Sequence, residues 1–272
     1  MAYEKLSNWK KLPELKGLLD LSSLPKEIFY QGKWDLKLFE NCVAVVGSRK
    51  ITEYGKRVIE KLVPQLVFEK KTIVSGFMYG TDQYVHQTCV DNGGKTVAIL
   101  GWGIDKKLFG YDKKLAEQII DSGGLLVSEW ETQEGTNWTF PARDRIIAAL
   151  ATEVYITEAA QKSGALITAR FATKLKRKIY AVPGPITSKT SVGTNNLIAA
   201  EMAKMWLPHF TKVSRGQDDP ILNILENEAL TVDEISRKLS LPVAEIGTKL
   251  TMLSLAGQVM ERGGKYFLND AS

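Results

Sequence analysis

Cysteine, histidine and long apolar runs are scarce in this chain of 272 residues, and each scarcity excludes a class of protein. Two cysteines, Cys42 and Cys89, are too few for a disulfide scaffold or a four-cysteine zinc site. With His86 and His209 as the only histidines, a histidine-based metal centre is not expected. No apolar run approaches the roughly 18 residues of a membrane span, and residues 1–10 lack the apolar region of a signal peptide. We therefore expect a soluble, cytoplasmic protein without a metal.

Charge is distributed unevenly along the chain. The whole sequence carries +5, from 36 Lys and Arg against 31 Asp and Glu. Residues 220–272 hold five basic and seven acidic side chains, which leaves +7 on residues 1–219. A basic body with an acidic tail indicates a polyanionic partner for the body. The composition, 44% hydrophobic and 25% charged, is that of an ordinary globular protein and excludes disorder and fibrous repeats.

The middle of the chain alternates short apolar runs with longer helical patterns, which predicts a doubly wound α/β sheet. Several apolar runs show no alternation, as in mostly parallel strands that helices cover on both faces. The expected strands span 42–46, 72–75, 96–100, 125–128, 153–156 and 178–182, and the helices between them 54–68, 82–92, 113–122, 143–150 and 164–175.

The remaining segments divide the chain into domains. Residues 1–40 are mixed in pattern, and we expect them to form a short lead-in packed on a Rossmann-like domain that spans 41–211. Residues 212–219 are polar without apolar periodicity, which is typical of a linker. After the linker, three short helices and a hairpin around two adjacent glycines predict a small winged-helix domain over 220–269. The third helix has Glu245 near its start and no Arg or Gln for base edges, so we expect this domain to bind a protein partner rather than to read DNA.

Four turns at strand ends or helix starts are rich in groups that can hold a phosphate. Backbone N–H groups at a glycine turn, together with a helix N-terminus, form such a site. Each turn alone is equally compatible with an ordinary strand–helix connection. The chain does not match a P-loop, because Lys50 stands where that motif requires a glycine. It does not match the dinucleotide-binding motif either, because Lys106 stands at the position of the third glycine. The four turns are Gly47-Ser48-Arg49, Ser75-Gly76, Ser163-Gly164 and Gly193-Thr194-Asn195.

The segment FPARDRII, residues 140–147, places two arginines beside an acid at a predicted helix start. A cation is unfavourable there because of the helix dipole, and bidentate contact with phosphate is one reason to accept that cost. A surface network between Arg143, Asp144 and Arg145 is the alternative. Trp138 and Phe140 can stack on bases or can be part of the core.

These segments belong to a series of six motifs in a fixed order: GSR at 47–49, SG at 75–76 with Gly80 and Asp82, FPxRxRII at 140–147, SGALITA at 163–169, VPG at 182–184 and GTNNLI at 193–198. The series resembles the DprA/Smf family of DNA-processing proteins over about residues 12–206. The C-terminal winged helix also looks like that family's.

The resemblance implies an extended Rossmann-like domain that binds and protects single-stranded DNA, forms a homodimer and loads a RecA-type recombinase during natural transformation. Apolar residues around the last predicted strand and helix supply a dimer face or belong to the core; they are Tyr180, Ile198, Met202, Met205, Trp206 and Phe210. Motifs and turns together give the predicted DNA-binding residues: Gly47, Ser48, Arg49, Ser75, Gly76, Arg143, Arg145, Ser163, Gly164 and Asn195.

The chain departs from the family pattern at three points. Residues 78–82 read MYGTD, where the family usually has a small residue, a polar residue and Gly-Ile-Asp. Asp144 replaces the usual Asn and puts a negative charge between two arginines, which we expect to weaken anion binding. We also expect the extra N-terminal domain of many members to be absent, because few residues precede the first strand.

Acidic residues also fall near predicted strand ends, at Asp82, Glu129 and Glu158. They either orient the pocket arginines or serve as catalytic carboxylates, as in related proteins that cleave the N-glycosidic bond of nucleoside monophosphates. The PGGxGTxxE loop of those enzymes is missing, and no nucleophile stands beside a base, so we expect neither a catalytic residue nor a cofactor. We expect His86 to be a packed or hydrogen-bonded histidine. The alternative function is that of a nucleotide-binding protein or nucleotide N-glycosidase with a partner-binding tail.

Overall fold

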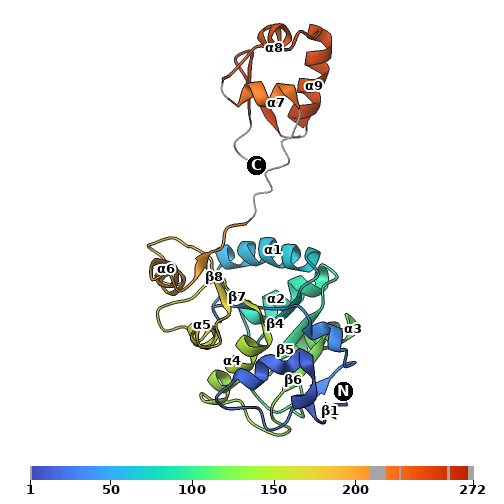
Figure 1. Cartoon of the computed structure of the whole chain (residues 1–272), viewed down its shortest axis with the longest axis vertical. Coiled ribbons are helices and arrows are strands. Elements are labelled where there is room, and N and C mark those ends of the chain that lie inside the picture. Colours follow the sequence, from blue (N-terminus) through green and yellow to red (C-terminus); the bar gives the residue numbers. More distant parts are fainter. Residues whose placement is uncertain (1, 209–218, 227, 256–257, 269–272) are drawn as a thin grey trace. The chain divides into compact units, whose positions relative to one another are not determined.

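The computed structural model describes residues 2–208, 219–226, 228–255 and 258–268, which belong to two compact units that divide after Pro208 (Figure 1). The first unit is an α/β domain around a nine-stranded sheet, and the second contains three helices and a hairpin. The predicted doubly wound sheet and the winged helix are both confirmed. Within the described ranges, no helix is long and apolar enough to cross a membrane. The predicted linker and Phe210 lie, apart from Asp219, outside the described residues.

The sheet of the first unit has the order β1-β2-β6-β5-β4-β3-β7-β8-β9. Strands β3 to β9 are parallel, whereas β2 pairs antiparallel with β6 and β1 pairs antiparallel with β2. The strands are β1 (Glu4–Lys5), β2 (Phe29–Gln31), β3 (Cys42–Val46), β4 (Thr72–Ser75), β5 (Thr96–Ile99), β6 (Leu125–Ser128), β7 (Glu153–Ile156), β8 (Lys178–Ala181) and β9 (Lys204–Met205).

The connections of the sheet reverse direction at its centre. From β3 the chain proceeds through β4 and β5 to β6, and it then crosses back to place β7 on the other side of β3. The two central strands pair from Val43–Glu153 to Val46–Ile156. Connections that leave neighbouring strands in opposite directions open a crevice at their carboxyl ends, where doubly wound sheets bind ligands. The topology therefore places a binding crevice beyond Val46 and Ile156.

Helices cover both faces of the sheet. α1 (Glu53–Phe68), α2 (Thr81–Asp91) and α3 (Gly110–Asp121) pack on one face, and α4 (Thr139–Leu150) and α5 (Ala165–Lys174) pack on the other. α6 (Val192–Ala199) follows β8 and contributes Leu197 to the same cluster as α4.

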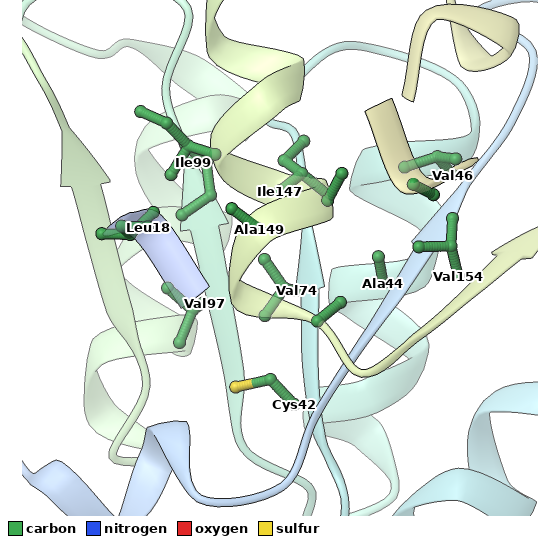
Figure 2. Packing of buried hydrophobic residues seen from close by; sticks show 14 of the residues in the cluster. Leu18, Cys42, Ala44, Val46, Val74, Val97, Ile99, Ile147, Ala149 and Val154 are labelled. Carbon is green, nitrogen blue, oxygen red and sulfur yellow. The ribbon is translucent and has the colours of Figure 1, made fainter. Parts of the chain in front are cut away.

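The central strands are buried on both faces, which explains their unbroken apolar sequences. In β3, Ala44 and Val46 face the α4 side while Val43 and Val45 face α1. Figure 2 shows Ile147 of α4 packed among the side chains of the central strands. Full burial of an aliphatic side chain stabilises the folded protein by about 1.5–3 kcal/mol relative to leaving the side chain exposed, so this layer fixes α4 firmly against the sheet. The first turns of α4 are held at the carboxyl edge in consequence.

Residues before β3 also belong to the sheet domain. β2 extends the sheet beside β6, and the 3-10 helix η2 (Pro13–Asp20) packs Leu15 and Leu18 into the α4 side of the core. Strands of two or three residues carry too little pattern to be recognised in a sequence, which is why β1, β2 and β9 were not predicted.

The second unit has its own small core. α7 (Pro220–Leu225), α8 (Val232–Leu239) and α9 (Val243–Leu255) precede a hairpin of β10 (Val259–Arg262) and β11 (Lys265–Leu268). Thr231 and Glu234 form a capping box at the start of α8. Gly263 and Gly264 have φ of 64° and 78°, the left-handed values that a tight two-residue hairpin turn requires.

Candidate nucleic-acid interface

A pocket of about 560 Å³ lies at the carboxyl ends of β3, β4 and β7, where the topology places the crevice. Its walls come mainly from four segments that are far apart in the sequence, and Thr190 also lines it. The turn after β3 contributes residues 46–50, and the turn after β4 contributes Met78, Tyr79 and Asp82. The first turns of α4 form the third wall, and residues 160–168 around the start of α5 form the fourth.

The structure brings six of the ten predicted DNA-binding residues to this pocket. They are Gly47, Ser48, Arg49, Arg143, Ser163 and Gly164. The other four, which do not line it, are Ser75, Gly76, Arg145 and Asn195.

Three exposed cations stand around the pocket. Arg49 and Lys50 follow β3, and Lys162 precedes α5. The guanidinium of Arg49 lies 5.0 Å from the centroid of the Phe140 ring, a cation–π contact that leaves its N–H groups available. Within residues 2–208, no acid lies within 4.0 Å of any of the three charged groups. Lys50 and Lys162 were missed in the sequence, although each adjoins a predicted turn.

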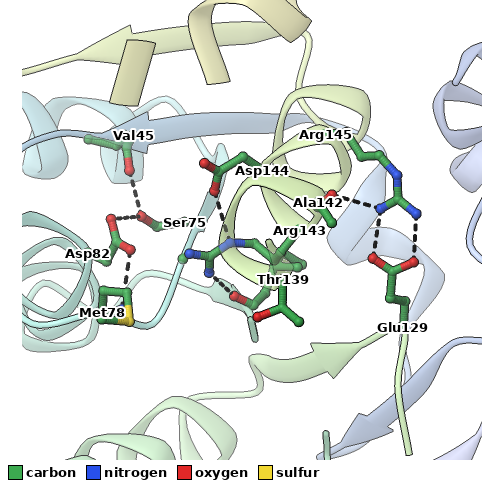
Figure 3. A network of polar contacts seen from close by, with 12 residues as sticks. Val45, Ser75, Met78, Asp82, Glu129, Thr139, Ala142, Arg143, Asp144 and Arg145 are labelled. Atoms are coloured by element: carbon green, nitrogen blue, oxygen red, sulfur yellow. Dashed lines mark hydrogen bonds and ion pairs between the residues drawn. The ribbon is translucent and has the colours of Figure 1, made fainter. Parts of the chain in front are cut away.

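Arg143, in contrast, is held inside the protein. It is only 3% exposed, and its Nε donates to Asp144 Oδ1 at 3.0 Å while Nη1 donates to the carbonyl of Ile99. A Cβ at Gly76 would collide with both the Arg143 guanidinium and the Asp82 carboxylate, so these groups lie directly over that glycine. Arg143 is therefore part of the back wall of the pocket rather than a projecting cation (Figure 3).

Ser75 and Gly76 support this wall from behind. The Ser75 hydroxyl lies 2.7 Å from the carbonyl oxygen of Val45, to which it donates, and 3.3 Å from Asp82 Oδ1. Asp82 Oδ2 accepts from the backbone N–H of Met78 at 3.3 Å, which fixes the turn that begins α2. The carbonyl of Gly76 lies 2.6 Å from His86 Nε2. These contacts explain the SG motif as a scaffold for the buried wall, and His86 is the hydrogen-bonded histidine that the sequence predicts.

The buried carboxylate of Asp144 and the partly buried carboxylate of Asp82 face the buried guanidinium of Arg143. Burial raises the pKa of Asp144 to about 6, and the nearby charge of Asp82 adds to the rise while Arg143 opposes it. Burial likewise raises the pKa of Asp82 above its ordinary value, against the influence of Arg143. The pocket therefore has an acidic floor beneath a basic rim.

Arg145 points away from the pocket. Its guanidinium makes a bidentate ion pair with Glu129, with Nη1 and Nη2 at 2.8 and 2.6 Å from the two carboxylate oxygens. It also donates to the carbonyls of Ser23 and Ala142, at 3.1 and 2.9 Å. Figure 3 shows Arg143 and Arg145 on different sides of α4. Arg145 thus connects α4 to the residue after β6 and to the N-terminal segment, and four of its five N–H groups donate there.

The start of α4 also differs from the prediction. The helix begins at Thr139 rather than at residue 143, and Pro141 occupies its first turn, where a missing N–H has no cost. Arg143 and Arg145 consequently lie in the second turn, beyond the strongest part of the helix dipole. The dipole argument for a phosphate at these two arginines therefore does not hold.

Asn195 and Glu158 position loops around the pocket. The Asn195 side chain makes two hydrogen bonds of 3.0 Å with the backbone of Gly184, which ties α6 to the turn after β8. Glu158 is buried and accepts from the Thr52 hydroxyl at 2.6 Å and from the Thr190 hydroxyl at 3.2 Å. Both residues hold structure in place behind the pocket walls.

Phe140 belongs to the core, as one of its two sequence interpretations predicts, whereas Trp138 does not. Phe140 is partly buried under Arg49, and Trp138 is 58% exposed but packs on Trp130 outside the pocket wall. Tyr79, which the sequence did not single out, lines the pocket and is also 58% exposed. It lies in the MYGTD segment that departs from the family pattern.

Family models match almost the whole chain. Residues 7–214 match a family described as DNA recombination-mediator protein A, and residues 213–265 match the DprA winged helix domain. The chain belongs to the DprA/Smf family. This confirms the resemblance that the six motifs indicated.

DprA/Smf relatives with curated descriptions include the DNA processing protein DprA of Streptococcus pneumoniae, which is 38% identical over 74% of this chain and 68% of its own length. Protein Smf of Escherichia coli K12 is 32% identical over 92% of this chain and 73% of its own length.

Two solved DprA structures share the fold. The Streptococcus pneumoniae protein has a TM-score of 0.66 at 34% identity, over 76% of this chain and 71% of its own. The Helicobacter pylori protein, described for its single-stranded DNA binding mode, also has a TM-score of 0.66, at 28% identity over 75% of this chain and 91% of its own.

Proposed function

We propose that this DprA/Smf chain binds single-stranded DNA in the pocket beside β3 and β7. The observation that carries the proposal is the basic rim: Arg49, Lys50 and Lys162 are exposed around one pocket and form no ion pair within 4.0 Å with an acid of residues 2–208. Cations that neutralise phosphates supply most of the affinity of sequence-independent DNA binding. The Helicobacter pylori relative, described by its single-stranded DNA binding mode, supports the same ligand.

The start of α5 adds to the favourable potential for a phosphate. Ser163, Gly164 and Ala165 line the pocket at the N-terminus of this ten-residue helix. The helix dipole places partial positive charge there, which favours an anion by about 0.3–1 kcal/mol. Gly47 allows the turn after β3 to lie close to Thr157 and Thr81, because a Cβ at this position would collide with both threonines. The site is built for a phosphate held between two turns.

Tyr79 explains a preference for a single strand. Its exposed ring is in the pocket wall, where an unpaired base can stack on it, whereas a paired base cannot leave its own stack without a cost. Stacking is tolerant of sequence, and phosphate contacts carry no sequence information. We therefore expect little base preference.

Fluorescence anisotropy with a labelled oligo-dT strand and a matched duplex tests this proposal. We expect the single strand to bind more tightly and the double variant Arg49→Ala/Lys162→Ala to lose at least tenfold in affinity. Lys61→Ala, on the exposed side of α1, is the matched control and should bind as the unmodified protein does. Equal affinity of the double variant would refute the pocket assignment. Incubation with AMP and CMP tests the alternative, and release of free base would favour the N-glycosidase.

We further propose that the protein acts as a homodimer. Met202, Met205 and Leu207 are 45–55% exposed and lie in or next to β9 in the sequence. Three large exposed apolar side chains within six residues favour association. Two other residues of the expected face are less available, because Trp206 is buried in the core and Tyr180 stacks on Tyr155 at 4.9 Å. Light scattering that finds only a 30.3 kDa species at micromolar concentration would refute the dimer.

The recombination-mediator family supports one further step, the transfer of the bound strand to a RecA-type recombinase in the cytoplasm during natural transformation. A protein that holds phosphates at the edge of a sheet leaves the rest of the strand open to a second protein. We expect the chain to accelerate recombinase filament formation on single-stranded DNA that is already coated with a single-strand-binding protein. No acceleration by a chain that binds DNA normally would refute this step alone.

A further inference from the structure

The floor of the pocket contains the buried guanidinium of Arg143, the buried carboxylate of Asp144 and the partly buried carboxylate of Asp82. Asp144 lines the pocket and accepts from Arg143 Nε at 3.0 Å, while Asp82 lies over Gly76 together with the same guanidinium. With both carboxylates ionised, the floor carries −1. A phosphate on the rim therefore meets a negative charge in a poorly solvated place, where like charges repel strongly.

We propose that Asp144 sets the anion affinity of the pocket: its ionised carboxylate opposes a bound phosphate, and its protonation strengthens the binding of single-stranded DNA at mildly acidic pH. The inference rests on the proposed function, since it concerns the same pocket and the same ligand. It assigns to one side chain the strength of the site and its dependence on pH.

Asp144 lines the pocket and is surrounded by charged groups from several elements. Arg143 is its neighbour on α4, Asp82 approaches from α2, and Arg49 approaches from the turn after β3. Lys50 and Lys162 line the same pocket. Burial raises the pKa of Asp144 to about 6, in spite of Arg143. His86, behind Arg143, stays neutral above pH 5 because burial lowers its pKa to about 4.

Thermodynamic linkage between phosphate binding and protonation of Asp144 determines how the affinity changes with pH. A phosphate near the carboxylate favours its protonated form, so binding raises the pKa of Asp144 and takes up a proton at pH values above about 6. Affinity is then highest below that pH and falls as the pH rises through it. A rise of one unit in the pKa on binding corresponds to about a tenfold change in the dissociation constant. Phosphodiester groups and thymine do not titrate between pH 5 and 8, so an oligo-dT strand adds no dependence of its own.

The experiment measures the affinity of the full chain for oligo-dT at pH 5, 6, 7 and 8 at constant ionic strength. We expect the unmodified protein to bind about tenfold more tightly at pH 5 than at pH 8, in accordance with a pKa shift of one unit. Asp144→Asn keeps an oxygen that can accept from Arg143. We expect the affinity of this variant for oligo-dT to vary less than about threefold between pH 5 and pH 8. At pH 8 it should bind as tightly as the unmodified protein does at pH 5.

Asp121→Asn is the matched control. Asp121 is exposed at the end of α3, outside the pocket lining, so its replacement removes one negative charge without altering the pocket. We expect this variant to keep the profile of the unmodified protein. Equal profiles for the unmodified protein and Asp144→Asn would overturn the inference, and if both profiles depended on pH, Asp82 would be the next candidate for the titrating group.

Sulfate, which does not titrate in this range, separates failure of the inference from failure of the proposed function. Its dissociation constant follows from the rise in the unfolding temperature at each pH. If Arg49→Ala/Lys162→Ala leaves DNA binding unchanged, the proposed function is refuted, and a sulfate profile that Asp144→Asn abolishes still supports the inference. A flat profile with both ligands overturns it.

Discussion

Replacing Arg145 by Met is expected to destabilise the sheet domain strongly while leaving its affinity for DNA within about twofold. The side chains of Arg145 and Glu129 are only 9% and 8% exposed, and they share two hydrogen bonds of 2.8 and 2.6 Å. Methionine has a similar length but leaves the Glu129 carboxylate buried without a partner. Removing one member of a buried ion pair costs about 3–5 kcal/mol, and the same range is expected here.

Tryptophan fluorescence during unfolding in urea measures this loss. All six tryptophans lie between residues 9 and 206, so their emission reports on the sheet domain and not on the winged helix. The double variant Arg145→Met/Glu129→Leu removes both charges, and it should recover most of the lost free energy because apolar replacement of a buried pair is close to neutral. Arg170→Met, at an exposed position on α5, is the control and should change stability by less than about 0.5 kcal/mol.

The opposite result would refute the structural assignment of Arg145. If Arg145→Met unfolds at the same urea concentration as the unmodified protein but binds oligo-dT tenfold more weakly, the guanidinium contacts DNA. The ion pair with Glu129 would then have to open on binding, and the prediction from the FPxRxRII motif would be correct for this residue.

Three other predictions concern the pocket and the tail. Gly76→Ala should lower the free energy of unfolding by about 1–3 kcal/mol, because the new Cβ overlaps Asp82 and Arg143. An unchanged urea midpoint would show that the pocket wall can move. Tyr79→Ala should weaken oligo-dT binding by about 1–3 kcal/mol and Tyr79→Phe hardly at all; equal loss in both would exclude stacking. A chain that ends at Arg215 should keep its single-strand affinity within a few-fold, and a loss beyond about 1.4 kcal/mol, or tenfold, would show that the winged helix touches DNA.

Much of the fold was predictable because its central strands and helices carry complete patterns. The strands from β3 to β8 were found with their ends correct to within one residue, since each is an apolar run bounded by glycine or polar residues. β1, β2 and β9 have two or three residues each and pair with strands far away in the sequence. Their positions are determined by tertiary packing and leave no local signal.

The sequence predicted which turns form the site, but it did not predict the direction in which each side chain points. Gly47, Ser48 and Arg49 line the pocket because the chain must leave β3 there. Arg143 and Arg145 look equivalent in the sequence, yet they turn to opposite sides of α4 because their partners, Asp144 with Ile99 and Glu129 with Ser23, lie on different sides. The contacts with Ile99, Glu129 and Ser23 join residues that are 16 to 122 positions apart, and such contacts cannot be inferred from a motif.

The salt dependence of oligo-dT binding tests most directly whether the basic rim holds phosphates. The logarithm of the association constant should fall linearly with the logarithm of salt concentration, by about 0.7 for each phosphate neutralised on a single strand. Arg49→Ala/Lys162→Ala removes two cations, so its slope should be smaller than that of the unmodified protein by about 1.4, again from the value of 0.7 per phosphate. A slope that stays the same in this double variant would contradict the account, because phosphates would then be bound elsewhere on the protein.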